Sequence, residues 1–304
     1  MDLKPTHLRT LTEVARAGTI SGAAEALGYT PSALSQQIAA LERTTGRQLL
    51  EPVGRTVRLT DAGRVLVDHA QRILGAFEEA AAALEATDTA IAGELRVGMF
   101  ESVAAFLLPR VLDELTAYPD LQVNAEQIEP SAAAAAVAAG TLDAAFVLDF
   151  IPEQATRGLD HTPVCRDRFR IVVGRDDPLT GPTADLRVLE GRDLIVEAHD
   201  ASGGGYVHRA CRAAGFAPTV RHHLHDYPAI LRLVQRGETV ALVPDLGLAF
   251  VPPDVRIIDP TPGSHRDVDL VTRPSSTDRP AVAALIRAVH TAATDLGLDT
   301  GPRR

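Results

Sequence analysis

The chain has 304 residues, 45% of them hydrophobic, and a formal net charge of −10 at pH 7. This length allows two or three compact units with cores of their own. No signal-peptide pattern or membrane-length apolar stretch is present, so we expect a cytoplasmic protein without membrane contact. The charge is uneven, because residues 1–60 carry seven cationic and five acidic side chains while the remainder is strongly acidic. Nucleic acid could therefore be bound by the N-terminal part alone.

Residues 18–38 predict two short helices joined by a tight turn. The first helix has one apolar stripe at helical spacing and ends at Gly28, and the stripe consists of Ile20, Ala23, Ala24 and Leu27. Thr30 is suited to cap the second helix, and Pro31 fits its first turn. This spacing is typical of a helix-turn-helix, in which the second helix enters the major groove of DNA.

The second helix presents small and polar side chains beside its apolar face. We expect DNA contacts from Thr30, Ser32, Ala33, Ser35, Gln36 and Gln37. The segment 54–59 is short, contains a glycine turn and carries Arg55 and Arg58, as expected of a β-hairpin wing that holds phosphates. A plain helical hairpin that binds nothing is the alternative, and the basic segment disfavours it.

Residues 61–91 predict one long helix of about 45 Å. Apolar residues recur in alternating steps of four and three, the spacing of a coiled-coil seam, and the seam residues are Leu66, Ala70, Ile73, Phe77, Ala80, Leu84 and Ile91, with Thr87 as the polar exception. Of these we expect Leu66, Ile73, Phe77, Ala80 and Leu84 to form a dimer interface. The alternative is an internal helix packed on its own domain. A dimer would present two recognition helices, which implies a near-palindromic operator.

From residue 93 onward, short β runs alternate with helical stretches, which predicts an α/β fold with parallel sheets. The expected strands are 95–99, 121–125, 142–148, 169–173, 194–196, 218–222, 239–243, 255–258 and 268–272, with helices at 102–117, 130–140, 206–214 and 279–296. We expect two lobes, the first formed by residues 93–165 together with 268–304 and the second by residues 166–267.

The chain resembles the LysR-type transcriptional regulators. The resemblance rests on the helix-turn-helix and on Ser35-Gln36-Gln37-Ile38, Leu41-Glu42, Gly46, Leu49-Leu50-Glu51 and Leu59-Thr60-Asp61-Ala62-Gly63, and it continues more weakly to the C-terminus. It implies a winged helix-turn-helix domain (1–60), a dimerisation linker helix (61–92) and a two-lobed effector domain like a periplasmic binding protein (93–304). It further implies small-molecule sensing and assembly beyond the dimer, often to tetramers.

Ligands of open parallel sheets bind beyond the carboxyl ends of the strands, where helices begin. The effector-site residues expected on this ground are Phe100, Glu101, Ser102, Ser131, Asp149 and Phe150 in the first lobe and His199, Ser202, Asp226, Tyr227 and Pro244 in the second. The serines could bind an anionic group or cap their own helices. The carboxylates of Glu101, Asp149 and Asp226 favour a zwitterion or an amine.

Three other features of the sequence give weaker indications of function. The run 222–226 holds three histidines and an aspartate but lacks the paired spacing of a zinc site, and we expect a polar strand edge and no metal. Cys165 and Cys211 are expected to be ordinary buried thiols. The glycine run 203–205 lacks the lysine of a phosphate-binding loop, so we expect no cofactor.

The leading hypothesis is a DNA-binding regulator controlled by a small molecule. An α/β enzyme with an appended helical domain is one alternative, but no nucleophile elbow, phosphate loop or zinc signature is present. A solute-binding protein is the other, and the helix-turn-helix and the missing export signal oppose it.

Overall fold

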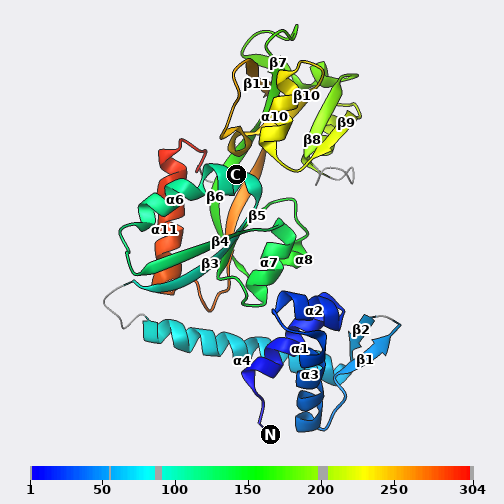
Figure 1. Ribbon diagram of the computed structural model, residues 1–304, viewed down its shortest axis with the longest axis vertical. Helices are drawn as coiled ribbons and strands as arrows, with labels where there is room; N and C mark the ends of the chain where they lie inside the picture. Colours follow the sequence, from blue (N-terminus) through cyan, green and yellow to red (C-terminus); the bar gives the residue numbers. More distant parts are fainter. Residues whose placement is uncertain (1, 55, 86–90, 198–204, 302–304) are drawn as a thin grey trace.

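The computed structural model describes residues 2–54, 56–85, 91–197 and 205–301. The molecule is elongated, with a helical N-terminal domain at one end, helix α4 beside it and two α/β lobes beyond (Figure 1). Within the described ranges, no helix is both long and apolar enough to cross a membrane.

The N-terminal domain is a winged helix-turn-helix, as predicted. Its elements are α1 (Pro5–Ala17), α2 (Ile20–Ala26), α3 (Pro31–Thr45), β1 (Leu50–Val53) and β2 (Thr56–Leu59). The hydroxyl of Thr19 caps α2 by accepting from the Gly22 amide at 3.1 Å, and that of Thr30 caps α3 through the Ala33 amide at 3.2 Å. Gly46 ends α3 with a φ of 63°. The strands β1 and β2 pair antiparallel as the wing.

Helix α4 (Asp61–Glu85) covers most of the predicted 61–91, and residues 86–90, Thr87 among them, lie outside the described residues. Its first half packs on the N-terminal domain, because Ala70 is fully buried and Leu66 and Ile73 are partly buried in that core. This half of the helix thus contacts its own N-terminal domain, as the alternative expected. Phe77 and Leu84, in contrast, are 57% and 72% exposed.

The first lobe is a sheet covered by helices on both faces. Its strands are β3 (Gly93–Met99), β4 (Leu121–Gln127), β5 (Ala144–Leu148) and β12 (His265–Thr272), and its helices are α5 (Glu101–Phe106), α6 (Leu108–Leu115), α7 (Pro130–Ala138), α8 (Glu153–Thr156) and α11 (Pro280–Asp295). Strand β3 runs parallel to both β4 and β5, as predicted. The single helix expected at 102–117 is divided at Leu107, one residue before the turn that contains Pro109.

The second lobe has a sheet and hydrophobic cores of its own. Its strands are β7 (Thr183–Asp185), β8 (Asp193–Glu197), β9 (Thr219–Leu224), β10 (Val240–Pro244) and β11 (Val255–Thr261), and its helices are α9 (Tyr206–Ala213) and α10 (Tyr227–Gln235). Short 3₁₀ turns cover Leu186–Leu189 and Asp245–Leu248. Strands β8, β9 and β10 are parallel to one another.

One long strand joins the sheets of the two lobes. The 15-residue strand β6 (Asp160–Gly174) pairs with β12 from Asp160 to Arg168 and then with β10 and β11 from Phe169 onward. Strand β6 therefore belongs to both sheets, and the change of partner at Arg168 and Phe169 marks the junction between the lobes. The predicted lobe boundaries remain a proposal, but they fall close to this point.

Candidate DNA-binding and effector sites

The outer face of α3 carries the polar side chains that were expected to meet DNA. Ser32, Ser35 and Gln36 are exposed, Ala33 is half-buried, and the Thr30 hydroxyl is engaged as the cap of α3. The hydroxyl of Thr10 in α1 donates to Oε1 of Gln37, which ties Gln37 to the inner side of the domain. Ser32, Ser35 and Gln36 therefore form the exposed polar surface of α3, although the Ser35 hydroxyl also donates to the Pro31 carbonyl at 2.9 Å.

The wing places a cation beside this face. Arg58 lies opposite Glu51 on the neighbouring strand, its Nε donates to the Glu51 carboxylate at 2.8 Å, and its side chain remains 71% exposed. Such an exposed pair contributes little to stability, so the guanidinium can turn to a phosphate at small cost. Arg55 lies outside the described residues.

A buried ion pair stands at the junction of the two lobes. Arg266 on β12 and Asp167 on β6 are register partners, 3% and 0% exposed, with 2.8 Å between Nε and Oδ2. The other Asp167 oxygen accepts from the Leu246 amide at 2.9 Å. Arg266 also donates to the Ser102 hydroxyl at 2.8 Å and so ties α5 of the first lobe to this pair. Burial raises the pKa of Asp167, while Arg266 and the Leu246 amide oppose that rise.

Aromatic rings enclose the guanidinium of Arg266. Its central carbon lies 5.2 Å from the centre of the Phe100 ring and 5.8 Å from that of Phe169. The ring of Tyr206, at the start of α9, stacks on Phe169 at 3.5 Å with an angle of 2° between the planes. Beside this stack is a cavity of only about 30 Å³, room for about one water molecule. The junction is filled by its own side chains.

Carboxylates from both lobes lie near the same point. Burial, followed by repulsion from Glu197 and Asp226, raises the pKa of Glu101 to about 7. Its Oε2 is buried and accepts no hydrogen bond from the described residues. Glu197 accepts a hydrogen bond from the Tyr227 hydroxyl at 2.7 Å. This site thus offers one carboxyl oxygen that still lacks a donor.

The structure brings together some of the expected effector residues and separates others. Phe100, Glu101, Ser102, Phe150 and Tyr227 lie at the junction or line its cavity. Asp226 caps α10 through the Ala229 amide at 2.8 Å and lies near enough to Glu101 to raise its pKa. The other described residues have different positions: Ser131 is exposed on α7, Asp149 accepts from the Asp267 amide at 3.2 Å, and Pro244 is buried at the end of β10. His199 and Ser202 lie outside the described residues.

Five residues of the junction were missed by the sequence reasoning, namely Asp167, Phe169, Glu197, Tyr206 and Arg266. A signal existed for two of them, since charged residues at 167 and 266 stand beside apolar β runs. Strand β12 was expected to begin at 268, so Arg266 was assigned to a connection rather than to a sheet.

The remaining sequence features show no site. Cys165 and Cys211 are free thiols and both are buried. The histidines at 222, 223 and 225 are exposed on or just after β9. Among the described residues, no group of three or more histidine, cysteine or acidic side chains could hold a metal ion.

Comparison with known proteins agrees with this arrangement. Residues 5–64 match the model of the bacterial regulatory helix-turn-helix proteins of the lysR family, and residues 89–294 match the LysR substrate binding domain. A probable hydrogen peroxide-inducible genes activator of Mycobacterium avium is 32% identical over 293 residues, or 88% of each chain. The uncharacterized regulator YnfL of Escherichia coli K12 is 29% identical and spans 80% of this chain and 83% of its own length.

Solved structures share the fold. A full-length OxyR variant from Pseudomonas aeruginosa superposes with a TM-score of 0.69 at 20% identity, with 95% of both chains covered. Full-length CbnR in complex with its target DNA gives a TM-score of 0.57 at 24% identity, with 96% of this chain and all of that one covered. Both matched family models describe parts of regulators rather than enzymes. The chain therefore belongs to the LysR family of transcriptional regulators, with a DNA-binding helix-turn-helix domain and an effector-binding domain.

Proposed function

We propose that this regulator binds a near-palindromic operator as a homodimer, with one α3 helix in each half-site. The observation that supports this is the polar face of α3, where Ser32, Ser35 and Gln36 are exposed. In this proposal Ala33 adds an apolar contact, Thr30 and Gln37 hold the helix in position, and Arg55 and Arg58 bind phosphates. Because a transcriptional regulator acts where the chromosome is, we also propose a cytoplasmic location.

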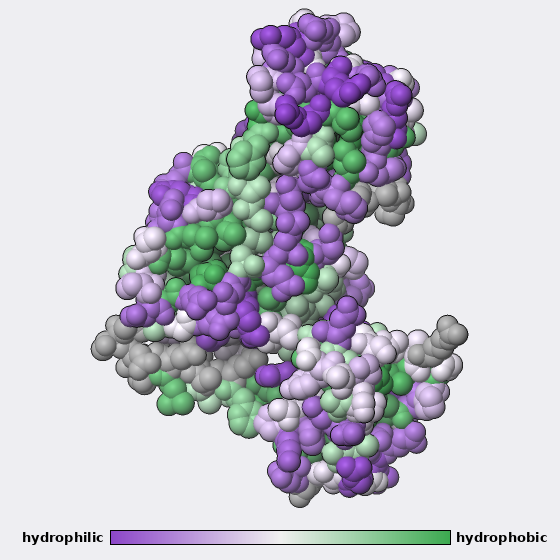
Figure 2. Space-filling model, viewed as in Figure 1, coloured by the Kyte–Doolittle hydropathy of each residue, from purple (hydrophilic) through white to green (hydrophobic). Residues whose placement is uncertain are grey.

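The dimer would form through the second half of α4. Phe77, Ala80 and Leu84 are exposed there, and apolar side chains are visible along this helix in Figure 2. Leu66 and Ile73 already contact the N-terminal core and would add little to a partner. Pairs of such dimers, joined through the effector domains, would give the tetramer that the family resemblance implies.

The effector would bind at the junction between the lobes. We propose a small amine-bearing or zwitterionic molecule with a flat apolar part. Its cationic group would supply the donor that Oε2 of Glu101 lacks, and its flat part would replace the Tyr206 ring on Phe169. Because the present cavity of about 30 Å³ is too small for such a molecule, binding requires Tyr206 to move. Movement of α9 would change the relative position of the lobes and so the spacing of the recognition helices.

We do not propose that this chain responds to peroxide, the signal in the names of its mycobacterial relatives. Both thiols of this chain are almost fully buried, at 4% exposure for Cys165 and 0% for Cys211. A cysteine that reacts with an oxidant is ordinarily accessible and has cationic surroundings that stabilise its thiolate.

Operator binding is tested by titrating the full-length protein with duplexes that contain a candidate palindrome from its own promoter region and with random duplexes of the same length. We expect tighter binding to the palindrome at every salt concentration and a linear fall of log affinity with log salt. Equal affinity for both duplexes would refute sequence-specific binding.

Effector binding is tested by a thermal-shift screen of the full-length protein against amino acids, aromatic amines and aromatic acids, because a ligand of the folded state raises the melting temperature. We expect the positive compounds to carry an amine. Near pH 7 their binding should release a proton from Glu101, which calorimetry in buffers of different ionisation enthalpy detects. Hits confined to acids without an amine would refute the ligand class but not DNA binding.

A further inference from the structure

A second cavity lies between the N-terminal domain and the first lobe, far from the junction described above. It has a volume of about 490 Å³, within the range of small-molecule sites. One wall comes from α1 and α4, and the other from the end of α7, the segment 157–159 and the segment 273–275. The two domains approach each other closely here, since a Cβ built on Gly75 would lie 4.0 Å from the Cβ of Ser275.

The lining of this interdomain cleft is strongly cationic. Arg9, Arg72, Arg157 and Arg273 all contribute to it. Glu13 is the single acidic side chain among the described lining residues, and it is only 1% exposed and bonded to the guanidinium of Arg16, with 3.0 Å between Nε and Oε1. The negative charge of Glu13 is therefore already compensated.

Three of the four arginines have no carboxylate partner among the described residues. Arg9 and Arg157 make no ion pair with any described residue, and both are exposed. The Arg72 guanidinium contacts a ring nitrogen of His69 at 3.0 Å, which does not compensate its charge. Several like charges around a concave surface repel one another, and an anion would relieve that repulsion.

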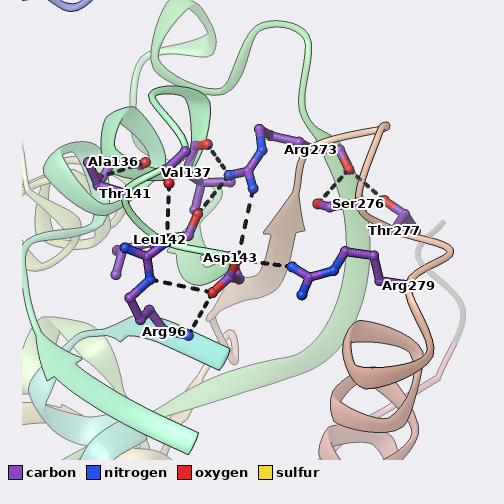
Figure 3. A network of polar contacts seen from close by, with 11 residues as sticks. Arg96, Ala136, Val137, Thr141, Leu142, Asp143, Arg273, Ser276, Thr277 and Arg279 are labelled. Atoms are coloured by element: carbon purple, nitrogen blue, oxygen red, sulfur yellow. Dashed lines mark hydrogen bonds and ion pairs between the residues drawn. The ribbon is translucent and has the colours of Figure 1, made fainter. Parts of the chain in front are cut away.

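The fourth arginine belongs to a network that is itself rich in cations (Figure 3). Arg273 donates to the carbonyl oxygens of Val137 and Leu142 at 2.6 and 2.7 Å. Asp143 pairs with Arg279 at 3.2 Å and lies 3.9 Å from Arg273 and 3.7 Å from Arg96. The Asp143 carboxylate thus lies within 4 Å of three guanidinium groups at this end of the first lobe.

We propose that the interdomain cleft binds a small polyanion, either a phosphorylated metabolite or a di- or tricarboxylate. The glycines and alanines of the lining, such as Gly75, Ala138 and Gly158, leave room for the ligand. Arg9 from α1 and Arg157 from the first lobe would bind it from opposite walls, as forked donors matched to phosphate and carboxylate oxygens. The cleft is lined by α1 and α4 rather than by the exposed face of α3, so DNA is not its proposed occupant.

Binding here would connect the DNA-binding domain to its own effector domain. A bridged pair of domains samples fewer relative orientations, so the polyanion would change operator affinity without entering the junction between the lobes. The cleft would thus act as a second regulatory input that reads the concentration of anionic metabolites.

The test is isothermal titration of the full-length protein with pyrophosphate and with citrate, against sodium chloride at matched ionic strength. We expect saturable binding of one anion per chain, with pyrophosphate tighter for a phosphate ligand class and citrate tighter for a carboxylate class. Arg157→Gln should weaken the binding at least tenfold. Arg287→Gln on α11, which removes a guanidinium that contacts only the Tyr118 hydroxyl among the described residues, should leave it unchanged.

Three results would overturn the proposal. The first is binding no stronger than that of chloride, and the second is an equal loss of binding in both variants. The third is competition of a random DNA duplex for the same Arg157-dependent binding, which would make the cleft part of a DNA surface. Because Arg157 is exposed, melting temperatures within a few degrees of the parent protein would confirm that both variants are folded.

Discussion

Asp167 and Arg266 face each other on neighbouring strands at the point where β6 leaves the first lobe and enters the second, and neither side chain reaches solvent. With Ser102 bonded to the same guanidinium, this pair holds three segments of the effector domain together. Removing one partner would leave a buried charge without compensation, which is far costlier than the loss of an exposed ion pair.

We therefore expect Asp167→Asn to lower the free energy of unfolding by about 3–5 kcal/mol, measured by urea denaturation of the full-length protein. The control is Arg175→Met, which breaks the exposed pair with Asp254 and should cost less than about 1 kcal/mol. A loss for Asp167→Asn no larger than the control value would contradict the role given to this pair.

The raised pKa of Glu101 gives stability a pH dependence. Because this pKa is about 7 in the folded protein and 4.5 for an unperturbed glutamate, the folded state binds the proton more tightly than the unfolded chain. The contribution of Glu101 is thus fully present below pH 4.5, and it is lost as the pH rises towards 7. Glu101→Gln should unfold like the parent at pH 4 and be more stable at pH 8, by at most about 3 kcal/mol. A pH-independent difference would contradict the assignment.

The wing arginine should act on affinity rather than on sequence preference. Arg58→Ala should weaken binding to specific and random duplexes alike and reduce the slope of log affinity against log salt by about 0.9 per lost phosphate contact. Arg175→Ala is a matched control, because its exposure and its carboxylate pairing resemble those of Arg58. An unchanged slope in the Arg58 variant would place the wing away from the DNA backbone.

Gln36 should act on sequence preference. Its side chain is exposed on α3, and loss of a base contact costs about 1–3 kcal/mol on the preferred operator only. Gln36→Ala should therefore reduce the ratio of specific to random affinity, as measured by fluorescence anisotropy on both duplexes. Equal losses on the two duplexes would rule out base reading by this residue.

A substitution of Phe77 tests the proposed dimer interface on α4. Phe77→Asp would place a charge in the proposed α4 interface, and the protein should sediment as a smaller species at low micromolar concentration. Phe250→Asp is the control, since Phe250 is similarly exposed, at 67% against 57%, but lies in the second lobe. If both variants keep the size of the parent, the α4 interface is incorrect.

Secondary structure could be predicted from the sequence where it depends on residues that are neighbours in the chain. The caps at Thr30 and Gly28 and the apolar stripe of α2 gave the helix-turn-helix, and the β-α-β pattern gave the parallel strands. The helix break at Leu107 and the burial of Leu66 and Ile73 were not predictable, since they depend on what packs against those segments.

The candidate site was predictable only in part for the same reason. Residues directly after a strand, such as Phe100 and Glu101, could be assigned to the sheet edge from topology alone. The pairing of Asp167 with Arg266 joins residues 99 positions apart, and the stack of Phe169 on Tyr206 depends on how α9 closes over the second sheet. Contacts of this kind arise from long-range packing, which no local pattern encodes.

The pairing of β6 with β12 determines which lobe of the effector domain can be completed first. Arg168 is paired with His265, so residues 169–264 form an insertion between two adjacent antiparallel strands of the first lobe. The second lobe is contiguous in the chain and can form while synthesis continues. The first lobe must wait for β12 and α11, which emerge last. During translation, the half of the effector domain that lies nearest the DNA-binding end is therefore completed after the half that lies farthest from it.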